Sequence, residues 1–288
     1  MEGSPLSFTM NIVESLRRAV AEGSLKIANM KPLLILLSLV ALSFCMYAGY
    51  RLFRKCEKIL SGYETMINSS QSLLAGQRRP FDVRRPLKVV CLGNSITRHG
   101  YLPAVEWYSD WGMAASREEN DYCHLLQGRL RQYNGESSVT PLNIACFERN
   151  PACDIDSLLG DVCRGADIIV IRLGENVQDD QSFGDNIQRL IDRCKACTPH
   201  VLVSGCFWLN GRVEKVLVNA ALDNKLKFIP LYWIGRMRDA YPRRGDAIYD
   251  TAGERYVVTK EFILTHPNDE GMASIANALF DAITCLEL

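Results

Sequence analysis

The stretch Lys88-Val-Val-Cys-Leu-Gly-Asn-Ser-Ile-Thr97 decides the fold of this chain. Its first five residues are mostly apolar and β-branched, which predicts a short buried strand. The Gly-Asn pair interrupts this pattern, and Ser95 is expected to begin a helix. A serine at the carboxyl end of a parallel strand lies where open α/β sheets bind ligands, and a helix N-terminus favours an anion. From this stretch alone, Ser95 is either a nucleophile or a helix cap.

Beyond this stretch, strand-like and helix-like patterns alternate to the end of the chain. The run from Asp167 to Leu173, DIIVIRL, is mostly apolar, as in a strand that is covered on both faces. Repeated strand-then-helix units predict an α/β fold in three layers, with a parallel sheet between two layers of helices. The expected strands are 88–92, 138–145, 167–173, 200–207 and 227–231, and the expected helices are 121–132, 155–164, 185–197, 212–224 and 271–286.

A long apolar run precedes this domain. Residues 33–50 carry no charge, and Lys31 and Arg51 bound them. A membrane-spanning helix needs ~20 apolar residues, so we expect a single transmembrane helix. The predicted segments are an N-terminal segment (1–31), the transmembrane helix (32–53), a helical stalk and linker (54–86) and the α/β domain (87–288).

Charge and cysteine spacing limit the partners and cofactors. Lys+Arg and Asp+Glu both number 33, so nucleic acid is not expected as a partner. Basic residues lie on both sides of the predicted span, so the positive-inside rule gives no orientation. Apolar residues recur at steps of three and four across 52–73, a stripe that would allow a homodimer; a lone helix is the alternative. No metal or cofactor is expected, because Cys194 and Cys197 form a C-x-x-C with no second pair at zinc spacing.

Two further stretches carry residue types that suit a serine nucleophile. His266 precedes the last predicted helix, and Pro267 stiffens its loop. A histidine held rigidly is a suitable general base; the alternative is a loop histidine with no chemical role. Gly174-Glu175-Asn176 follows the predicted strand 167–173, and the Asn176 amide is a candidate donor to an oxyanion. The alternative there is a glycine turn with a capping asparagine.

Taken together, the three stretches resemble the SGNH (GDSL-type) hydrolase family. Residues 93–95, Gly-Asn-Ser, are similar to its first block, 174–176 to its Gly-x-Asn block, and 266–272 to its last block. The resemblance covers about residues 87–288. It implies a flavodoxin-like three-layer fold with Ser95 as nucleophile and His266 as base. It also implies an oxyanion hole formed by the Ser95 N–H, the Asn176 side chain and a backbone N–H from the second block.

Three positions depart from the family's pattern. Asn94 replaces an aspartate, which we expect to cost little. The second block has no glycine, so Ala145, or else Cys146, would supply its N–H. Where the family has an aspartate three residues before its histidine, this chain has Ile263, which cannot orient an imidazole. Either another carboxylate does so, or a Ser–His dyad works with a backbone carbonyl. The candidate carboxylates are Glu148, Glu175, Glu261 and Asp269.

These observations lead to a functional hypothesis. Trp107 and Trp111 lie in the long loop after Ser95, where they are expected to bind substrate or, alternatively, to pack as a lid. The leading hypothesis is a membrane-anchored serine esterase that hydrolyses acyl esters, such as O-acetyl esters, of an envelope glycan or lipid. By family habit its domain would be extracytoplasmic. The alternatives are an O-acyltransferase and a non-catalytic binding module of an envelope complex, and Ile263 favours the latter.

Overall fold

The computed structural model describes residues 40–41, 43–51, 54 and 85–286. The chain divides into two compact units, Met1–Ser72 and Leu73–Leu288. The described residues before position 85 are helical. No helix in the described ranges is long and apolar enough to cross a membrane. Much of the predicted span and nearly all of the predicted stalk and dimer stripe (52–73) lie outside the described residues.

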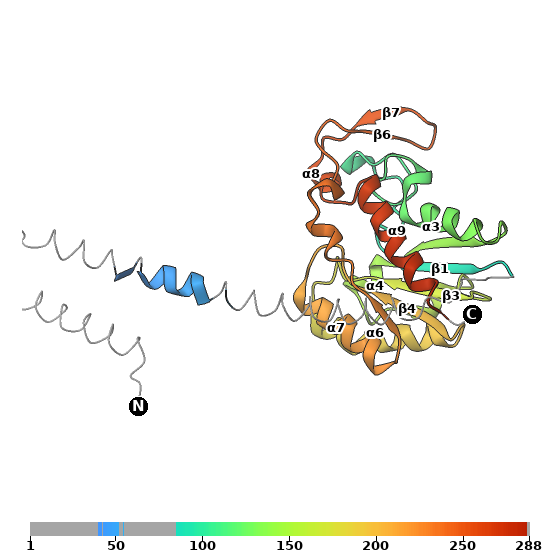
Figure 1. Ribbon diagram of the computed structural model, residues 1–288, viewed down its shortest axis with the longest axis horizontal. Helices are drawn as coiled ribbons and strands as arrows, with labels where there is room; N and C mark the ends of the chain where they lie inside the picture. The colour runs from blue at the N-terminus through green and yellow to red at the C-terminus, as the bar shows by residue number, and fades with distance from the viewer. Residues whose placement is uncertain (1–39, 42, 52–53, 55–84, 287–288) are drawn as a thin grey trace, which may run out of the picture. The chain divides into compact units, whose positions relative to one another are not determined.

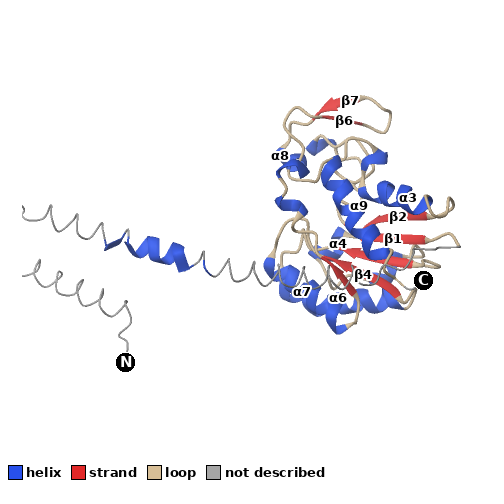
Figure 2. Cartoon of the chain, in the orientation of Figure 1, coloured by secondary structure: helices blue, strands red, loops and turns tan. Residues whose placement is uncertain are grey.

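The second unit is built on a sheet of five parallel strands in the order β2-β1-β3-β4-β5. This is the flavodoxin-like order, which confirms the predicted α/β fold. Helices α3 and α9 cover one face of the sheet, and α6 and α7 cover the other (Figures 1 and 2). The strands are β1 (Lys88–Gly93), β2 (Ser138–Asn143), β3 (Ile168–Arg172), β4 (His200–Ser204) and β5 (Lys227–Ile229). The α-helices are α3 (Tyr122–Arg131), α4 (Ala145–Arg149), α5 (Ile155–Leu159), α6 (Asp180–Lys195), α7 (Gly211–Asp223), α8 (Glu261–Leu264) and α9 (Asp269–Ile283).

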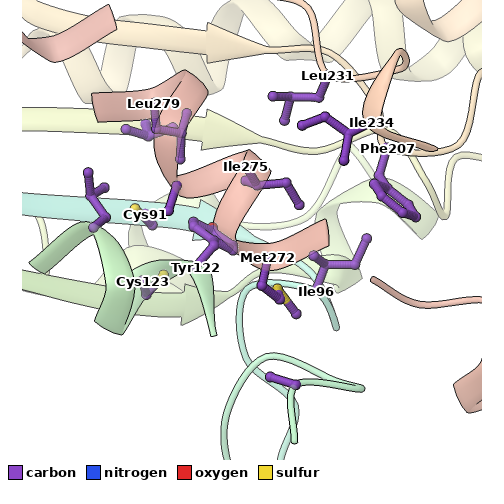
Figure 3. Packing of buried hydrophobic residues seen from close by; sticks show 14 of the residues in the cluster. Cys91, Ile96, Tyr122, Cys123, Phe207, Leu231, Ile234, Met272, Ile275 and Leu279 are labelled. Carbon is purple, nitrogen blue, oxygen red and sulfur yellow. The ribbon is translucent and has the colours of Figure 1, made fainter. Parts of the chain in front are cut away.

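The first strand is buried on both faces, as its apolar run predicted. Val89 and Cys91 pack in the cluster formed with α3 and α9, whereas Val90 and Leu92 pack in the cluster formed with α6 and α7. Alternation of side chains along a strand produces this division. Figure 3 shows Cys91 beside side chains of α3 and α9. The two clusters hold β1 rigidly, and β1 carries Ser95 just beyond its carboxyl end.

The sequence patterns did not predict several short elements. These are α4, α8 and an antiparallel hairpin of β6 (Ala247–Tyr249) and β7 (Arg255–Val257). Each spans five residues or fewer, which is too short for a helical or strand periodicity to appear. Two of them matter for function, since α4 carries Glu148 and α8 carries Phe262.

The helix that we expected to begin at Ser95 is a single turn. The carbonyl of Asn94 accepts the N–H groups of Thr97 and Arg98, at 2.9 and 3.0 Å. The next residue instead donates its N–H to the Trp111 carbonyl at 2.8 Å, so the chain leaves the helical course. With no α-helix to cap, the capping interpretation of Ser95 is wrong.

Candidate active site

The site residues converge because their strands are neighbours. β1 pairs with both β2 and β3, so the strand order changes direction at the β1–β3 boundary. Ser95 follows β1, and the turn of residues 174–176 follows β3. Open α/β sheets bind ligands outside the carboxyl ends of the strands at such a switch point. His266 reaches the same place from the loop between α8 and α9.

Ser95 and His266 form a hydrogen-bonded pair. Ser95 Oγ lies 2.9 Å from His266 Nε2, and the histidine is 1% exposed. Its other ring nitrogen, Nδ1, lies 2.8 Å from the carbonyl oxygen of Phe262. A carbonyl only accepts, so Nδ1 carries the hydrogen and Nε2 is left as the acceptor facing the serine hydroxyl. This is the tautomer that a general base requires.

The Phe262 carbonyl occupies the place of the missing acid. Ile263, at the family's aspartate position, is fully buried in the apolar core that includes α9. The short helix α8 directs this side chain into the core while the preceding carbonyl faces His266. Of the two predicted arrangements, the structure has the Ser–His dyad with a backbone carbonyl.

None of the four candidate carboxylates contacts His266 within residues 85–286. The Asp269 carboxylate accepts the backbone N–H of Ser116 at 2.7 Å. Glu261 lies on the surface, 3.4 Å from a guanidinium nitrogen of Arg244. The other two candidates belong to a buried network around Asn94. A carboxylate partner for the imidazole is therefore absent from the described part of the chain.

His266 is neutral over a wide pH range. Burial lowers its pKa to about 4. The hydrogen bond to the Phe262 carbonyl raises this pKa, while positive charge on His99 and Arg172 lowers it further. At neutral pH the imidazole is thus unprotonated and able to accept a proton.

Asn94, beside the serine, is the centre of the buried network. Its Oδ1 accepts from the backbone N–H of Ile96 at 3.2 Å and from the Arg172 guanidinium at 3.1 Å. Both partners only donate, so Nδ2 must face the remaining neighbours, Glu148 at 3.1 Å and Glu175 at 2.7 Å. An aspartate has no N–H to give these two carboxylates. Our expectation that asparagine here costs little missed its role: the network requires an amide.

A buried ion pair holds the end of β3. Arg172 is fully buried, and its guanidinium lies 2.5 Å from Glu175. The same carboxylate oxygen accepts the Phe207 N–H at 2.8 Å, which ties in the loop after β4. Removing one partner of such a pair is costly, because it leaves an uncompensated charge.

In the described ranges, no group of three or more His, Cys, Asp and Glu side chains is placed to hold a metal ion.

The turn after β3 presents Asn176 to the site. Its Nδ2 donates one hydrogen to Glu148 at 2.6 Å, which leaves the second hydrogen for another acceptor. Gly174 has φ of 135°, and a Cβ there would lie 2.3 Å from Cys206 Sγ. Only glycine fits this position, because any side chain would clash with Cys206 and strain the backbone.

The backbone N–H that we expected from the family's second block does not come from Ala145. The Ala145 N–H donates to Asn143 Oδ1 at 2.9 Å, so it is not free for an oxyanion, and the prediction for Ala145 is wrong. The next amide, that of Cys146, has no side-chain acceptor among residues 85–286. Within the same range, the Ser95 N–H has no hydrogen-bond partner. The sequence carried a signal for this arrangement, because an asparagine side chain commonly accepts the backbone N–H two residues later, as Asn143 does here.

The two tryptophans predicted to bind substrate are core residues. Trp107 and Trp111 are 0% and 5% exposed, and their ring centroids lie 6.0 Å apart. Their indole N–H groups donate to the carbonyls of His99 and Ala115, at 2.7 and 3.1 Å. The loop folds back on itself and buries both rings, as in the alternative of a packed lid. The substrate-binding prediction for this pair is therefore wrong.

Other aromatic rings lie beside the dyad. The Trp208 ring centroid is 5.2 Å from that of His266, and the indole donates to the Thr265 carbonyl at 2.7 Å. The Phe262 ring centroid is 5.0 Å from His266, and this residue is 49% exposed. Sequence reasoning missed both. The available signals were that Trp208 closely follows β4 and that Phe262 precedes the histidine by one helical turn.

Comparisons with known proteins give matches only among solved structures. No family model matches the chain, and no curated protein matches it. An acetylxylan esterase, Axe2 from Geobacillus stearothermophilus, is 13% identical over 70% of this chain and 96% of its own, with a TM-score of 0.43. A lipase/acylhydrolase from Enterococcus faecalis is 12% identical over 69% of this chain and 95% of its own (TM-score 0.44). The acetyl xylan esterase AlAXEase is 17% identical over 68% of this chain and 100% of its own (TM-score 0.45). In its sequence blocks the chain resembles hydrolases of the SGNH type.

Proposed function

We propose that this chain is a serine esterase. One observation carries the proposal: at the carboxyl edge of the sheet, Ser95 Oγ lies 2.9 Å from the unprotonated Nε2 of His266. A hydroxyl needs such a base to become a nucleophile near neutral pH. The pKa of about 4 supports the same role, because it keeps the imidazole available as a proton acceptor.

The reaction proceeds through an acyl-enzyme. Ser95 Oγ attacks the ester carbonyl carbon while its proton passes to His266 Nε2. The tetrahedral intermediate collapses, the bond to the alcohol oxygen breaks, and His266 returns the proton to that oxygen. Water then attacks the acyl-enzyme and gives its proton to His266. Collapse of the second intermediate releases the carboxylic acid and returns the proton to Ser95.

Three donors would hold the oxyanion. These are the N–H of Ser95, the second Nδ2 hydrogen of Asn176 and the N–H of Cys146. Each lies just beyond the carboxyl end of β1, β3 or β2, which are neighbouring strands. Removing one such donor from a serine hydrolase typically lowers kcat by about 10²–10³-fold.

The dyad accounts for catalysis without a carboxylate. The Phe262 carbonyl fixes the tautomer of His266 and faces the charge that forms on the ring, but it contributes a dipole instead of a full negative charge. Loss of the acid from a triad lowers kcat by up to about 10⁴-fold, so turnover below that of a complete triad is expected. The binding-module alternative drew its support from Ile263, and the Phe262 contact weakens that support.

The aromatic rings suggest where the alcohol part of the ester lies. His266 protonates the leaving oxygen, so the leaving alcohol lies on the side of the site where Trp208 and Phe262 are found. Aromatic faces suit a sugar ring or an acyl chain, which agrees with a glycan or lipid ester as substrate. An O-acetyl ester, the membrane anchor at 32–53 and an extracytoplasmic domain remain part of this proposal. Acyl transfer would share the acyl-enzyme and differ only in its acceptor.

Hydrolysis of a short-chain aryl ester by the purified full chain tests the proposal. Ser95→Ala and His266→Ala should each abolish turnover above the uncatalysed rate. Ser157→Ala, at an exposed helix start far from this site in sequence, is the matched control and should hydrolyse like the wild type. Undiminished activity of Ser95→Ala would contradict the mechanism. Product analysis with water and a sugar competing as acceptors separates hydrolysis from transfer.

A further inference from the structure

We propose that Glu148 is a positioning residue that orients the Asn176 amide towards the oxyanion. This inference rests on the proposed esterase function. The sequence offered Glu148 only as a candidate partner for the histidine, and it does not contact that residue. Glu148 instead contacts residues next to, or among, the proposed oxyanion donors.

The carboxylate of Glu148 is buried and surrounded by donors. The residue is 1% exposed. Oε1 accepts the Gly174 N–H at 2.6 Å and the Asn94 Nδ2 at 3.1 Å. Asn176 donates twice, from its backbone N–H to Oε1 at 3.3 Å and from Nδ2 to Oε2 at 2.6 Å. Burial and the Glu175 carboxylate raise the pKa of Glu148, whereas the hydrogen bonds from Gly174, Asn176 and Asn94 lower it. Every partner donates, which is the arrangement that an ionised carboxylate accepts.

This arrangement decides which end of the Asn176 amide faces which neighbour. A carboxylate only accepts, so the amide must turn its NH₂ group, and not its oxygen, towards Glu148. The second hydrogen of that NH₂ is then available to the reacting oxygen. Without the carboxylate, the amide is free to rotate by half a turn and to place its oxygen where negative charge develops. That orientation would repel the oxyanion.

Glu148 also joins the three segments that supply the proposed oxyanion hole. It lies on α4 together with Cys146, it binds Asn94 next to Ser95, and it binds Asn176. Glu148 therefore shares a helix with one donor, contacts the residue before the second and binds the third. Donors for an oxyanion must be fixed before the reaction, because reorganisation during the reaction costs rate. The position of Glu148 provides this fixed arrangement.

The test is a double-mutant cycle of Glu148→Gln and Asn176→Ala in the full chain. Glu148→Gln should lower kcat by about 10–100-fold with KM within about threefold, because the lost orientation acts on the transition state. In the Asn176→Ala background the same substitution should lower kcat by less than about threefold, since there is no amide left to orient. Glu214→Gln is the matched control: it changes a buried glutamate that binds the Cys206 N–H instead, and kcat should stay within about threefold of the wild type.

A second measurement does not depend on activity. In NMR spectra of the wild type, the side-chain NH₂ signals of Asn176, assigned by their loss in Asn176→Ala, should be strongly inequivalent because one hydrogen binds a carboxylate. In Glu148→Gln the separation of the two signals should shrink towards that of a solvent-exposed asparagine, whose two amide hydrogens still differ through their cis and trans positions. Equal fold-losses from Glu148→Gln in both backgrounds, or NH₂ signals that Glu148→Gln leaves unchanged, would overturn the inference. A wild type with inequivalent signals but no Ser95-dependent hydrolysis would instead contradict the proposed function and leave the orientation of Asn176 supported.

Discussion

The low pKa of His266 predicts that, as the pH falls, activity is lost through this residue only well below the pH at which histidines usually titrate. Burial lowers this pKa to about 4, against about 6.5 for an unperturbed side chain. Protonation removes the base, so the loss of activity that belongs to His266 should lie near pH 4. At pH 5 about 90% of His266 would be neutral, compared with about 3% for an ordinary histidine. The active fraction therefore differs by about 30-fold between the two cases.

The assay is kcat/KM for an uncharged aryl ester between pH 3.5 and 8. Samples held at each pH and returned to pH 7 separate acid unfolding from titration. His99→Gln should move this loss of activity to higher pH, because it removes a positive charge that lowers the pKa of His266. His124→Gln is the matched control, since this histidine pairs with Asp121 and should leave the loss of activity in place.

Two buried carboxyls need their own controls. Burial and the neighbouring Glu175 carboxylate raise the pKa of Glu148, so a loss of activity above pH 4 would belong to this group if it disappears in Glu148→Gln. Burial raises the pKa of Glu214 to about 7, so a loss of activity near neutral pH would belong to this group if it disappears in Glu214→Gln. A loss of activity with its midpoint near pH 6.5 in the wild type, Glu148→Gln and Glu214→Gln alike would refute the reasoning. It would mean that solvent or an anion stabilises the imidazolium, contrary to the buried dyad with a carbonyl.

Two substitutions that restore the family's residues should be harmful. Ile263→Asp buries a carboxylate in the apolar core. We therefore expect it to lower the free energy of unfolding by about 3 kcal/mol or more and to give no gain in kcat. The control Ile263→Val should lower the free energy of unfolding by only about 1 kcal/mol. Urea unfolding measures both, and a tenfold gain in kcat at unchanged stability would show that the introduced carboxylate reaches the imidazole. Asn94→Asp removes the two N–H donors that face Glu148 and Glu175 and brings three carboxylates together, so it should cost on the order of 3 kcal/mol and most of the activity. Wild-type stability and turnover in that variant would contradict the role of the amide.

The fold and the central pair follow from signals that a sequence carries strongly. The apolar run of β1 and the alternation of strands and helices determine the sheet. Because the carboxyl ends of parallel strands share one edge, Ser95 and Asn176 were expected to meet there. His266 was found through its place before the last helix and its resemblance to a family block.

The remaining features depend on contacts that leave no mark on residue type. The partner of the His266 Nδ1 is the carbonyl of Phe262, and every residue has a carbonyl. Trp107 and Trp111 have a composition that fits either a lid or a binding surface, and only the folding of their loop decides between these. The roles of Asn94 and Glu148 depend on which donors and acceptors surround them once three loops have come together.

Labelling of the purified full chain with a fluorophosphonate tests the central claim most directly, because the reagent reacts with a serine only when base and oxyanion hole are in place. Mass spectrometry at pH 7 should find one adduct, on Ser95, which is absent from Ser95→Ala and forms much more slowly in His266→Ala. No adduct on Ser95 of the folded wild type, or labelling that persists at the same rate in Ser95→Ala, would contradict the account.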